Sequence, residues 1–374
     1  MRARWLALAA LLALSGCETL SYYAQAIGGQ LELMHRAQPL TEWISNRATP
    51  PVLRRRLELA ARMREFASRE LALPDNGSYR SYAELSRPYV VWNVFAAPEF
   101  SVRPVESCFP IAGCVAYRGF FARDGAERYT AQERAAGLDV FSYGVPAYST
   151  LGWFDDPLLS TFIHYPESEL ARLIFHELAH QVVYVKGDTT FNESFAVTVQ
   201  DEGVRRWLES EGRGAELAAF RAAQARNDEF ADLIEDAHKR LARLYAEALA
   251  PGAMRAAKRA EFAQLNERYA ALKVRWSGYA GFDRLMRDPN NALLASISTY
   301  TQRVPGFRRE LAAAHGDLST FYARVKALAR LPKAERDAAL GSGPAQAMAP
   351  QRAVQPRSML SAAPVIVPAD SPHR

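Results

Sequence analysis

The spacing of hydrophobic residues divides the chain into a mixed first part and a helical second part. Residues 20–73 have helical periodicity that breaks near Pro39 and at Pro50 and Pro51. Residues 88–154 are richer in Val, Tyr, Phe and Trp, with Gly and Pro between them, which is typical of strands and turns. The strand candidates are Tyr89–Phe95, Val115–Phe121 and Val140–Tyr143.

From residue 158 to residue 337 the pattern predicts helix almost throughout. The clearest helices are 214–249, 254–276 and Asn290–Tyr300. The first two are Ala-rich and laced with opposite charges, so we predict an antiparallel pair around Pro251 and Gly252. Their charged faces, including His238, and the arginine run 54–56 are expected to be solvated. The fold class is therefore predicted as α+β and predominantly helical, with a small sheet early in the chain.

One predicted helix spans residues 166–186. Its apolar stripe consists of Leu170, Leu173, Ile174, Leu178 and Val182. Pro166 suits the first helical position, and acidic residues follow in the first turn. Lys186 and Gly187 are expected to end the helix.

This helix carries the sequence His176-Glu177-Leu178-Ala179-His180. Histidines four residues apart point to the same side of a helix and can bind one zinc ion together. Glu177 lies beside them, where a carboxylate can accept a proton from a water on the metal. This H-E-x-x-H arrangement is typical of zinc peptidases, so His176 and His180 are predicted ligands and Glu177 the predicted general base.

Catalytic zinc needs a third protein ligand. The metzincin extension is excluded, because Val183 and Lys186 replace its glycine and histidine. We predict Glu193 instead, at the start of a following helix with Asn192 as its N-cap. The six residues from Gly187 to Asn192 can span roughly 20 Å when extended, which lets the chain return. Glu202 is the rival third ligand, and Asp188 and His164 are weaker alternatives.

Three segments resemble a known family. They are Ala147–Pro157, the His176–His180 motif, and Lys186–Glu193. Asn192-Glu193-Ser194-Phe195-Ala196 is similar to the third-ligand motif Asn-Glu-Gly-Phe-Ala of gluzincin aminopeptidases. The chain from its N-terminus to about residue 330 resembles a bacterial family of aminopeptidases that are typically envelope lipoproteins. The resemblance implies a zincin-like fold, one Zn²⁺ ion, and peptide substrates trimmed from their N-termini.

Several roles remain open at this stage. Candidate donors for the oxyanion are Tyr143, Tyr148, His164 and Tyr300, and candidate carboxylates for the substrate amine are Glu99, Asp155 and Asp156. The Gly-x-Met-Glu-Asn signature of the large aminopeptidases is absent. Ala196 and Val197 stand where gluzincins often have an Asp that supports a ligand histidine. Ser149–Phe154 is a predicted strand that could hold a peptide along its edge.

The N-terminus reads as an export signal. Arg2 and Arg4 precede a short apolar core, Trp5 to Leu14, that is too short for a stable membrane span. Residues 14–17, Leu-Ser-Gly-Cys, resemble a bacterial lipobox, which implies cleavage after residue 16 and lipidation of Cys17. By the same resemblance, Glu18 favours the outer membrane, with the protein facing the periplasm. The alternative is cleavage and free secretion.

Three cysteines leave Cys108 and Cys114 as a pair if Cys17 carries lipid. We predict a disulfide between them that closes a hairpin. The formal charge is only +5, and the chain contains no block of Lys and Arg that indicates nucleic-acid binding.

Residues 17–337 are predicted to form a single metallopeptidase region, with a mixed part (20–157) and a helical part (158–337) that carries the zinc site. Residues 338–374 are rich in Ala, Pro, Ser and Gln and are predicted to be disordered. Three functions remain in contention: an aminopeptidase, an envelope zinc endopeptidase, and a non-catalytic lipoprotein with a structural zinc site.

Overall fold

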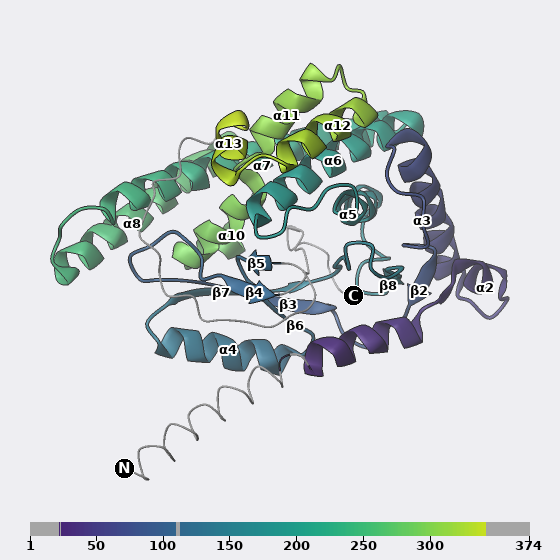
Figure 1. The fold of residues 1–374 in the computed structure, drawn as a ribbon, viewed down its shortest axis with the longest axis horizontal. Coiled ribbons are helices and arrows are strands. Elements are labelled where there is room, and N and C mark those ends of the chain that lie inside the picture. Colours follow the sequence, from purple (N-terminus) through teal and green to yellow (C-terminus); the bar gives the residue numbers. More distant parts are fainter. Residues whose placement is uncertain (1–21, 23, 110–112, 342–374) are drawn as a thin grey trace, which may run out of the picture.

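The computed structural model describes residues 22, 24–109 and 113–341. In these residues the fold is α+β and predominantly helical, which confirms the predicted class (Figure 1). The predicted signal peptide, Cys17 and residues 342–374 of the predicted tail lie outside the described residues. None of the described helices is both long and apolar enough to cross a membrane.

Prolines separate the first helices, as predicted. Residues 24–36 are helical, and α2 (Leu40–Ser45) and α3 (Pro51–Glu70) follow. Pro39 and Pro50 are the N-cap residues of α2 and α3. The helices before them end earlier, at residue 36 and at Ser45. A proline has no backbone N–H, which the start of a helix does not need, so each one suits the position before a new helix.

The described strands form three small groups. The first sheet has the strand order β1 (Gln38–Pro39), β2 (Ser81–Ala83), β8 (Leu158–Leu159). The second sheet has the strand order β6 (Arg118–Phe120), β3 (Val91–Ala97), β7 (Asp139–Val145). The third group is the pair of β4 (Ser107–Phe109) and β5 (Gly113–Val115). In the second sheet β3 is antiparallel to both neighbours, with a continuous register against β7. In the first sheet β2 is antiparallel to β1 and parallel to β8.

The second sheet lies between two helices (Figure 1). Its two faces carry alternate residues of each strand. Val94 clusters with Ala126 of α4 (Arg123–Ala135), and Phe95 clusters with Tyr300 of α10 (Asn291–Thr301). Tyr300 is thereby fixed between the sheet and the helical part of the molecule.

The single strand predicted over Val115–Phe121 is wrong. Val115 pairs with Ser107 in the β4–β5 hairpin, whereas Phe120 pairs with Trp92 in the second sheet. The hydrophobic pattern of the segment is continuous, but its two ends pair with different strands. The pattern alone cannot show this, because the partner strands lie elsewhere in the sequence. The sequence pattern also missed α4, because few of its residues are buried and apolar.

The β4–β5 hairpin carries a disulfide between Cys108 and Cys114, which face each other across the two strands. Gly113 has a positive φ of 79°, which glycine adopts without strain. A Cβ atom at this position would lie 2.6 Å from the Gly187 nitrogen. The hairpin therefore packs directly against the loop that follows the H-E-x-x-H helix.

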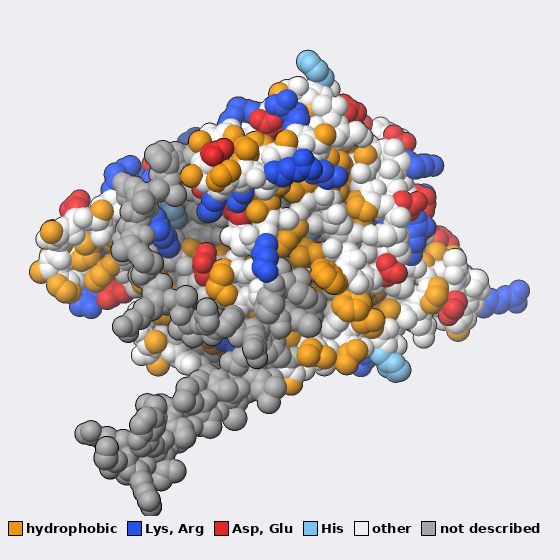
Figure 2. All heavy atoms as spheres, viewed as in Figure 1, with side chains coloured by type: hydrophobic (Ala, Val, Ile, Leu, Met, Phe, Trp, Pro, Cys, Tyr) orange, Lys and Arg blue, Asp and Glu red, His pale blue; other side chains and the backbone are white. Residues whose placement is uncertain are grey.

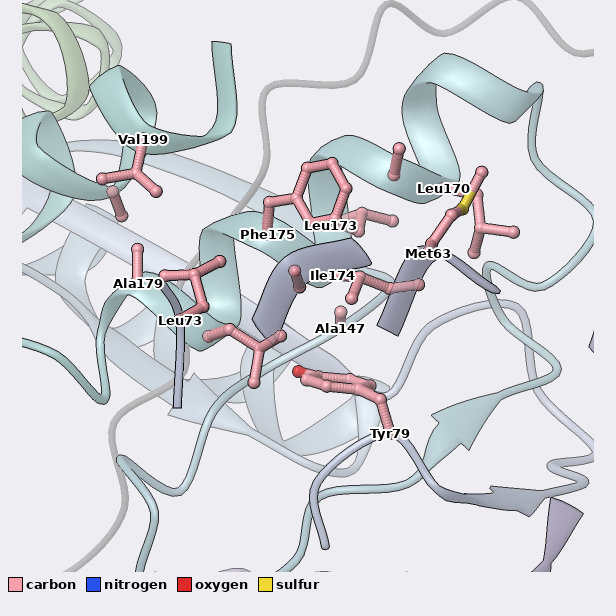
Figure 3. Close-up of a cluster of buried hydrophobic side chains, with 14 of the residues drawn as sticks. Met63, Leu73, Tyr79, Ala147, Leu170, Leu173, Ile174, Phe175, Ala179 and Val199 are labelled. Atoms are coloured by element: carbon pink, nitrogen blue, oxygen red, sulfur yellow. The ribbon is translucent and has the colours of Figure 1, made fainter. Parts of the chain in front are cut away.

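The two helices of the predicted zinc site are α5 (Glu167–Ala179) and α6 (Thr189–Ser210). In α5 the residues of the apolar stripe pack with α3 and α6 in the largest core of the described chain. Figure 3 shows Met63 of α3 beside Leu170 and Ile174 of α5, with Val199 of α6 at the opposite side of the view. This packing holds α5 rigidly at the centre of the molecule.

The predicted bounds of these helices need correction. Helix α5 ends at Ala179 rather than at 186, and Pro166 is its N-cap rather than its first residue. Residues after His180 leave the helix because Gln181 turns to the loop before β2, where it binds the side chains of Asn76 and Ser78. Asp188, not Asn192, caps α6. Its carboxylate accepts a hydrogen bond from the Phe191 nitrogen at 3.2 Å.

The remaining helices are α7 (Gly214–Leu244), α8 (Pro251–Arg275), α9 (Asp283–Met286), α11 (Val304–Ala313), α12 (Leu318–Ala329) and α13 (Lys333–Ala339). The predicted pair around Pro251 is confirmed by α7 and α8, which project from the body (Figure 1). Figure 2 shows basic and acidic side chains interspersed on the visible face of this pair. His238 is half-buried beside Val102, so its predicted exposure is wrong. Arg56 is also half-buried and donates to the Ile163 carbonyl at 2.8 Å.

Candidate metal centre

His176, His180 and Glu193 bring three ligand atoms together in the core. The two Nε2 atoms are 3.2 Å apart, and Glu193 Oε2 lies 3.3 Å from that of His176 and 3.5 Å from that of His180. No more than 3% of any of the three residues is exposed. These groups can hold a metal ion.

The spacing of these atoms agrees with a tetrahedral ion. Zinc–nitrogen and zinc–oxygen bonds of 2.0–2.1 Å place two ligand atoms of a tetrahedron about 3.3 Å apart. Glu193 Oε2 is buried and has no hydrogen-bond partner in the described part of the chain. Burial lowers the pKa of His176, which favours the neutral imidazole that a metal requires. The donor set therefore fits a divalent cation such as zinc.

Two local features return Glu193 to the histidines. The Asn192 side chain donates to the Val185 carbonyl at 2.8 Å and accepts from the Val185 nitrogen at 2.7 Å, which closes the loop between α5 and α6. Asp188 caps α6 and forms an ion pair with Arg336 of α13 at 2.9 Å. The first turn of α6 is thus held from both sides.

The comparisons with known proteins give one match. The chain matches the model of a family described as "Putative aminopeptidase" over residues 21–340. It belongs to this family. No curated protein and no solved structure matches the chain. The match covers the sheets, both helices of the metal centre and the helices that follow, so the activity implied for this aminopeptidase family is that of a peptidase acting on peptides.

Gln200 contacts His176, one of the three residues of the candidate metal centre. Its Oε1 atom lies 2.8 Å from Nδ1 of His176, and its Nε2 donates to Asp201 Oδ1 at 3.2 Å. An acceptor at Nδ1 fixes the ring so that Nε2 faces the metal. The sequence analysis left this support unassigned, although Gln200 follows Glu193 by seven residues and so lies on the same helix face.

Glu177 is completely buried, and both of its carboxylate oxygens lack hydrogen-bond partners among the described residues. Burial, together with the neighbouring acids Glu193 and Asp156, raises the pKa of Glu177 well above its usual value. A carboxylate with a raised pKa is a better proton acceptor near neutral pH. The predicted base therefore lies beside the ligands in a suitable environment.

The rival ligands lie elsewhere. Glu202 forms ion pairs with Arg205 and Arg206 at 2.7 and 2.6 Å. Asp188 binds Arg336, as described above, and His164 is exposed. None of the three belongs to the group of converging ligand atoms.

Among the candidate oxyanion donors, Tyr300 has the surroundings that best suit a hydrogen-bond donor to a substrate oxygen. It is 2% exposed, and its hydroxyl has no hydrogen-bond partner in the described part of the chain. Burial and then Glu193 raise its pKa, and Tyr143 lies beside it. Tyr148 is buried near Asp156 instead. An unpaired, protonated hydroxyl beside the ligand set can donate to a substrate oxygen.

Sequence reasoning missed Tyr79. This residue is 2% exposed, has a positive φ of 62°, and its hydroxyl lacks a partner in the described part of the chain. Glu177 is among the charges that raise its pKa, after burial. Figure 3 shows the Tyr79 ring lying against the core beside α5. Buried Arg64 holds the preceding loop by donating to Ser78 and Pro74 carbonyls at 2.8 and 2.7 Å.

The predicted strand Ser149–Phe154 is wrong, and so is its role as a sheet edge. The segment is a turn in which the Thr150 nitrogen donates to Asp156 Oδ2 at 2.9 Å. Leu151 has a positive φ of 57°, which no strand residue adopts.

The three candidate carboxylates for the substrate amine lie in different surroundings. Glu99 is paired with Arg255 at 2.6 Å on the surface, and Asp155 is exposed. Asp156 is buried and binds Thr150.

Proposed function

We propose that this protein is a zinc-dependent aminopeptidase of the H-E-x-x-H type with a zincin-like arrangement of α5 and α6. The observation that carries the proposal is the convergence of His176, His180 and Glu193, with ligand atoms 3.2–3.5 Å apart, beside the buried base Glu177. The family match supports the peptidase class. One Zn²⁺ ion is the proposed cofactor.

The residues divide the chemistry between them. His176, His180 and Glu193 would hold the ion, and Gln200 orients His176. When bound, zinc lowers the pKa of a coordinated water and polarises the scissile carbonyl. Glu177 accepts the proton of the attacking water and delivers it to the leaving amine. Tyr300 donates a hydrogen bond to the oxygen on which negative charge develops.

We also propose that the protein is an envelope lipoprotein. The supporting observation is the N-terminal pattern: a basic start, a short apolar core and the Leu-Ser-Gly-Cys sequence that ends at Cys17. Cleavage before Cys17 and its lipidation would tether residues 17–337, the metallopeptidase region, to the outer membrane. Metabolic labelling with a fatty acid tests this, and a Cys17→Ser variant that is still labelled would contradict it.

The function is tested with Glu177→Gln. We expect loss of peptide hydrolysis by at least about 1,000-fold, because no other group replaces the base, while zinc content stays near one ion per chain. Activity that survives this change would overturn the mechanism. A structural zinc site would instead bind zinc and hydrolyse no peptide in the wild-type protein.

The endopeptidase alternative is separated by acetylating the N-terminus of the test peptides. An aminopeptidase loses these substrates, whereas an endopeptidase cleaves them at an unchanged rate.

A further inference from the structure

A cavity of about 300 Å³ lies between α5, α6, α7, α10 and α11. His176 and Tyr300 belong to its lining, whereas Glu177, His180 and Glu193 do not, so the cavity adjoins the candidate metal centre on the side of His176. The volume is at the lower end of the range for small-molecule pockets, which suits one or two amino-acid residues.

The lining combines apolar, acidic, basic and amide side chains. The apolar residues include Val197, Phe230, Phe282 and Ile297. The acidic residues Asp228 and Asp232 come from α7, four residues apart and so on one face of that helix. An apolar wall with a few fixed polar groups is the usual construction of a specific binding pocket.

The ion pairs leave one charge of this lining uncompensated. Arg308 binds both Asp201 at 3.1 Å and Asp228 at 2.7 Å. Arg172 lies 3.3 Å from Glu169. Asp232 has no ion pair within 4.0 Å in the described part of the chain. The cavity therefore favours a cation over an anion.

Asp232 also lies in a negative environment. Asp232 is exposed, and partial burial and the neighbouring Asp228 raise its pKa, while Lys239 and Arg308 act in the opposite direction. The hydroxyl of Tyr300, a buried residue of the same lining, lacks a hydrogen-bond partner among the described residues. An acid without a cation and a donor without an acceptor thus line the same cavity.

We propose that this cavity binds the N-terminal residue of the peptide substrate, with Asp232 accepting the free ammonium group and the apolar wall contacting an apolar side chain. The inference rests on the proposed function and deepens it. An ammonium group supplies the missing cation, and the adjoining peptide carbonyl supplies an acceptor near Tyr300. The paired arginines leave no free cation there for a C-terminal carboxylate. The carboxylates expected from the sequence, Glu99, Asp155 and Asp156, do not line this cavity.

The test combines binding and kinetics on the zinc-loaded full chain. The probes are a tripeptide with an N-terminal leucine and its N-acetyl form. Calorimetry in the inactive Glu177→Gln background measures affinity for both, with and without Asp232→Asn. Asp288→Asn is the matched control, because Asp288 is exposed and lies outside the cavity. Thermal melting checks that each variant folds.

We expect acetylation and Asp232→Asn each to weaken binding by about 10- to 100-fold, the range for a hydrogen bond to a charged group. Together they should weaken it no further than either alone, because both remove the same contact. Asp288→Asn should change nothing. In the active protein, Asp232→Asn should raise KM for the free tripeptide by a similar factor.

A failure of the Asp232 assignment can be distinguished from a failure of the proposed function. If the wild-type protein hydrolyses the tripeptide and Asp232→Asn keeps the full preference for a free amine, the assignment of Asp232 is overturned and the proposed function stands. If the zinc-loaded wild-type protein hydrolyses neither peptide, the proposed function is overturned and this inference falls with it.

Discussion

At the scale of single residues, the centre depends on buried polar atoms whose partners are few. His176 has one acceptor at Nδ1, the amide of Gln200, and Glu177 has none among the described residues. A buried polar group without a partner costs free energy, so such groups persist where function requires them. Tyr79 and Tyr300 have the same property, and the charges of Glu177 and Glu193, respectively, act on them, which places both near the candidate metal centre.

Gln200→Ala should weaken zinc binding by about 10- to 100-fold, because the His176 ring loses the acceptor that orients it. Competition with a chromophoric chelator measures this. Gln200→Glu is the control, since a carboxylate also accepts at Nδ1 and should keep most of the affinity. Equal zinc affinity in the wild-type protein and Gln200→Ala would contradict the role of Gln200.

Tyr300→Phe should lower kcat by about 100-fold and leave zinc content unchanged, because it removes only the donor for the developing oxyanion. Steady-state kinetics and metal analysis on the same sample test this. Tyr148→Phe is the control, because that hydroxyl lies near Asp156. A loss of activity in Tyr148→Phe but not in Tyr300→Phe would reverse the assignment.

Burial raises the pKa of Asp156 to about 7. A carboxyl with a raised pKa binds more protons in the folded than in the unfolded state between about pH 4 and 7, so its contribution to stability falls as pH rises through this range. Tyr79, Tyr148 and Glu177 are the neighbouring groups that sense its charge.

Asp156→Asn should therefore reduce the loss of stability between pH 4.5 and pH 8 by about 2–4 kcal/mol. Urea denaturation of the metal-free protein at both values measures this difference. The loss of the Asp156 charge also lowers the pKa of Glu177, which changes the pH dependence in the same direction. The same pH dependence of stability in the wild-type protein and in Asp156→Asn would show that the pKa of Asp156 is not raised.

At the scale of elements, two helix ends meet at the metal centre. Helix α5 ends at the ligands, and α6 begins four residues before Glu193. The cap of α6, Asp188, is 3% exposed and pairs with Arg336 of α13, which is 7% exposed. Burial also acts on the pKa of Asp188, but Lys333 and Arg336 hold it below its usual value. Helix α13 is thereby coupled to the start of α6 although about 150 residues separate them.

Arg336→Ala should lower the free energy of unfolding by about 3 kcal/mol, because it leaves a buried carboxylate without its closest cation. Lys333→Ala, which removes an exposed partner of the same acid at 3.3 Å, should cost less than about 1 kcal/mol. Chemical denaturation measures both changes. A larger effect for Lys333 would show that the buried contact is not the one that holds α6.

At the scale of the whole molecule, distant segments enclose the loop between α5 and α6. The β4–β5 hairpin with its disulfide packs against Gly187, and α13 holds Asp188 next to it. The loop is thus fixed by a segment before α5 and by the last described helix. We therefore expect this enclosure to help fix the distance between the histidines and Glu193.

The double variant Cys108→Ala with Cys114→Ala should lose about 2 kcal/mol of stability, the chain-entropy value for a loop this short. Because the hairpin contacts the loop, zinc should also dissociate faster than from the wild-type protein. Denaturation and stopped-flow transfer of zinc to a chelator measure the two effects. Unchanged zinc release would show that the hairpin does not act on the metal centre.

The sequence by itself determined whatever depends on local spacing. Helical periodicity places His176 and His180 on one face, and the Asn290–Tyr300 pattern predicted α10 within a residue at each end. The proline breaks and the α7–α8 pair have the same local origin. Such features are predictable because neighbouring residues in the chain decide them through backbone geometry.

Only the tertiary structure decided what depends on contacts between distant segments. It ended α5 at Ala179, divided Val115–Phe121 between two sheets, and turned the expected strand Ser149–Phe154 into a loop. It also placed Tyr300 and Asp232 around the cavity that His176 lines. These outcomes follow from burial and pairing across the molecule, and no local pattern contains the identity of a partner that lies a hundred residues away.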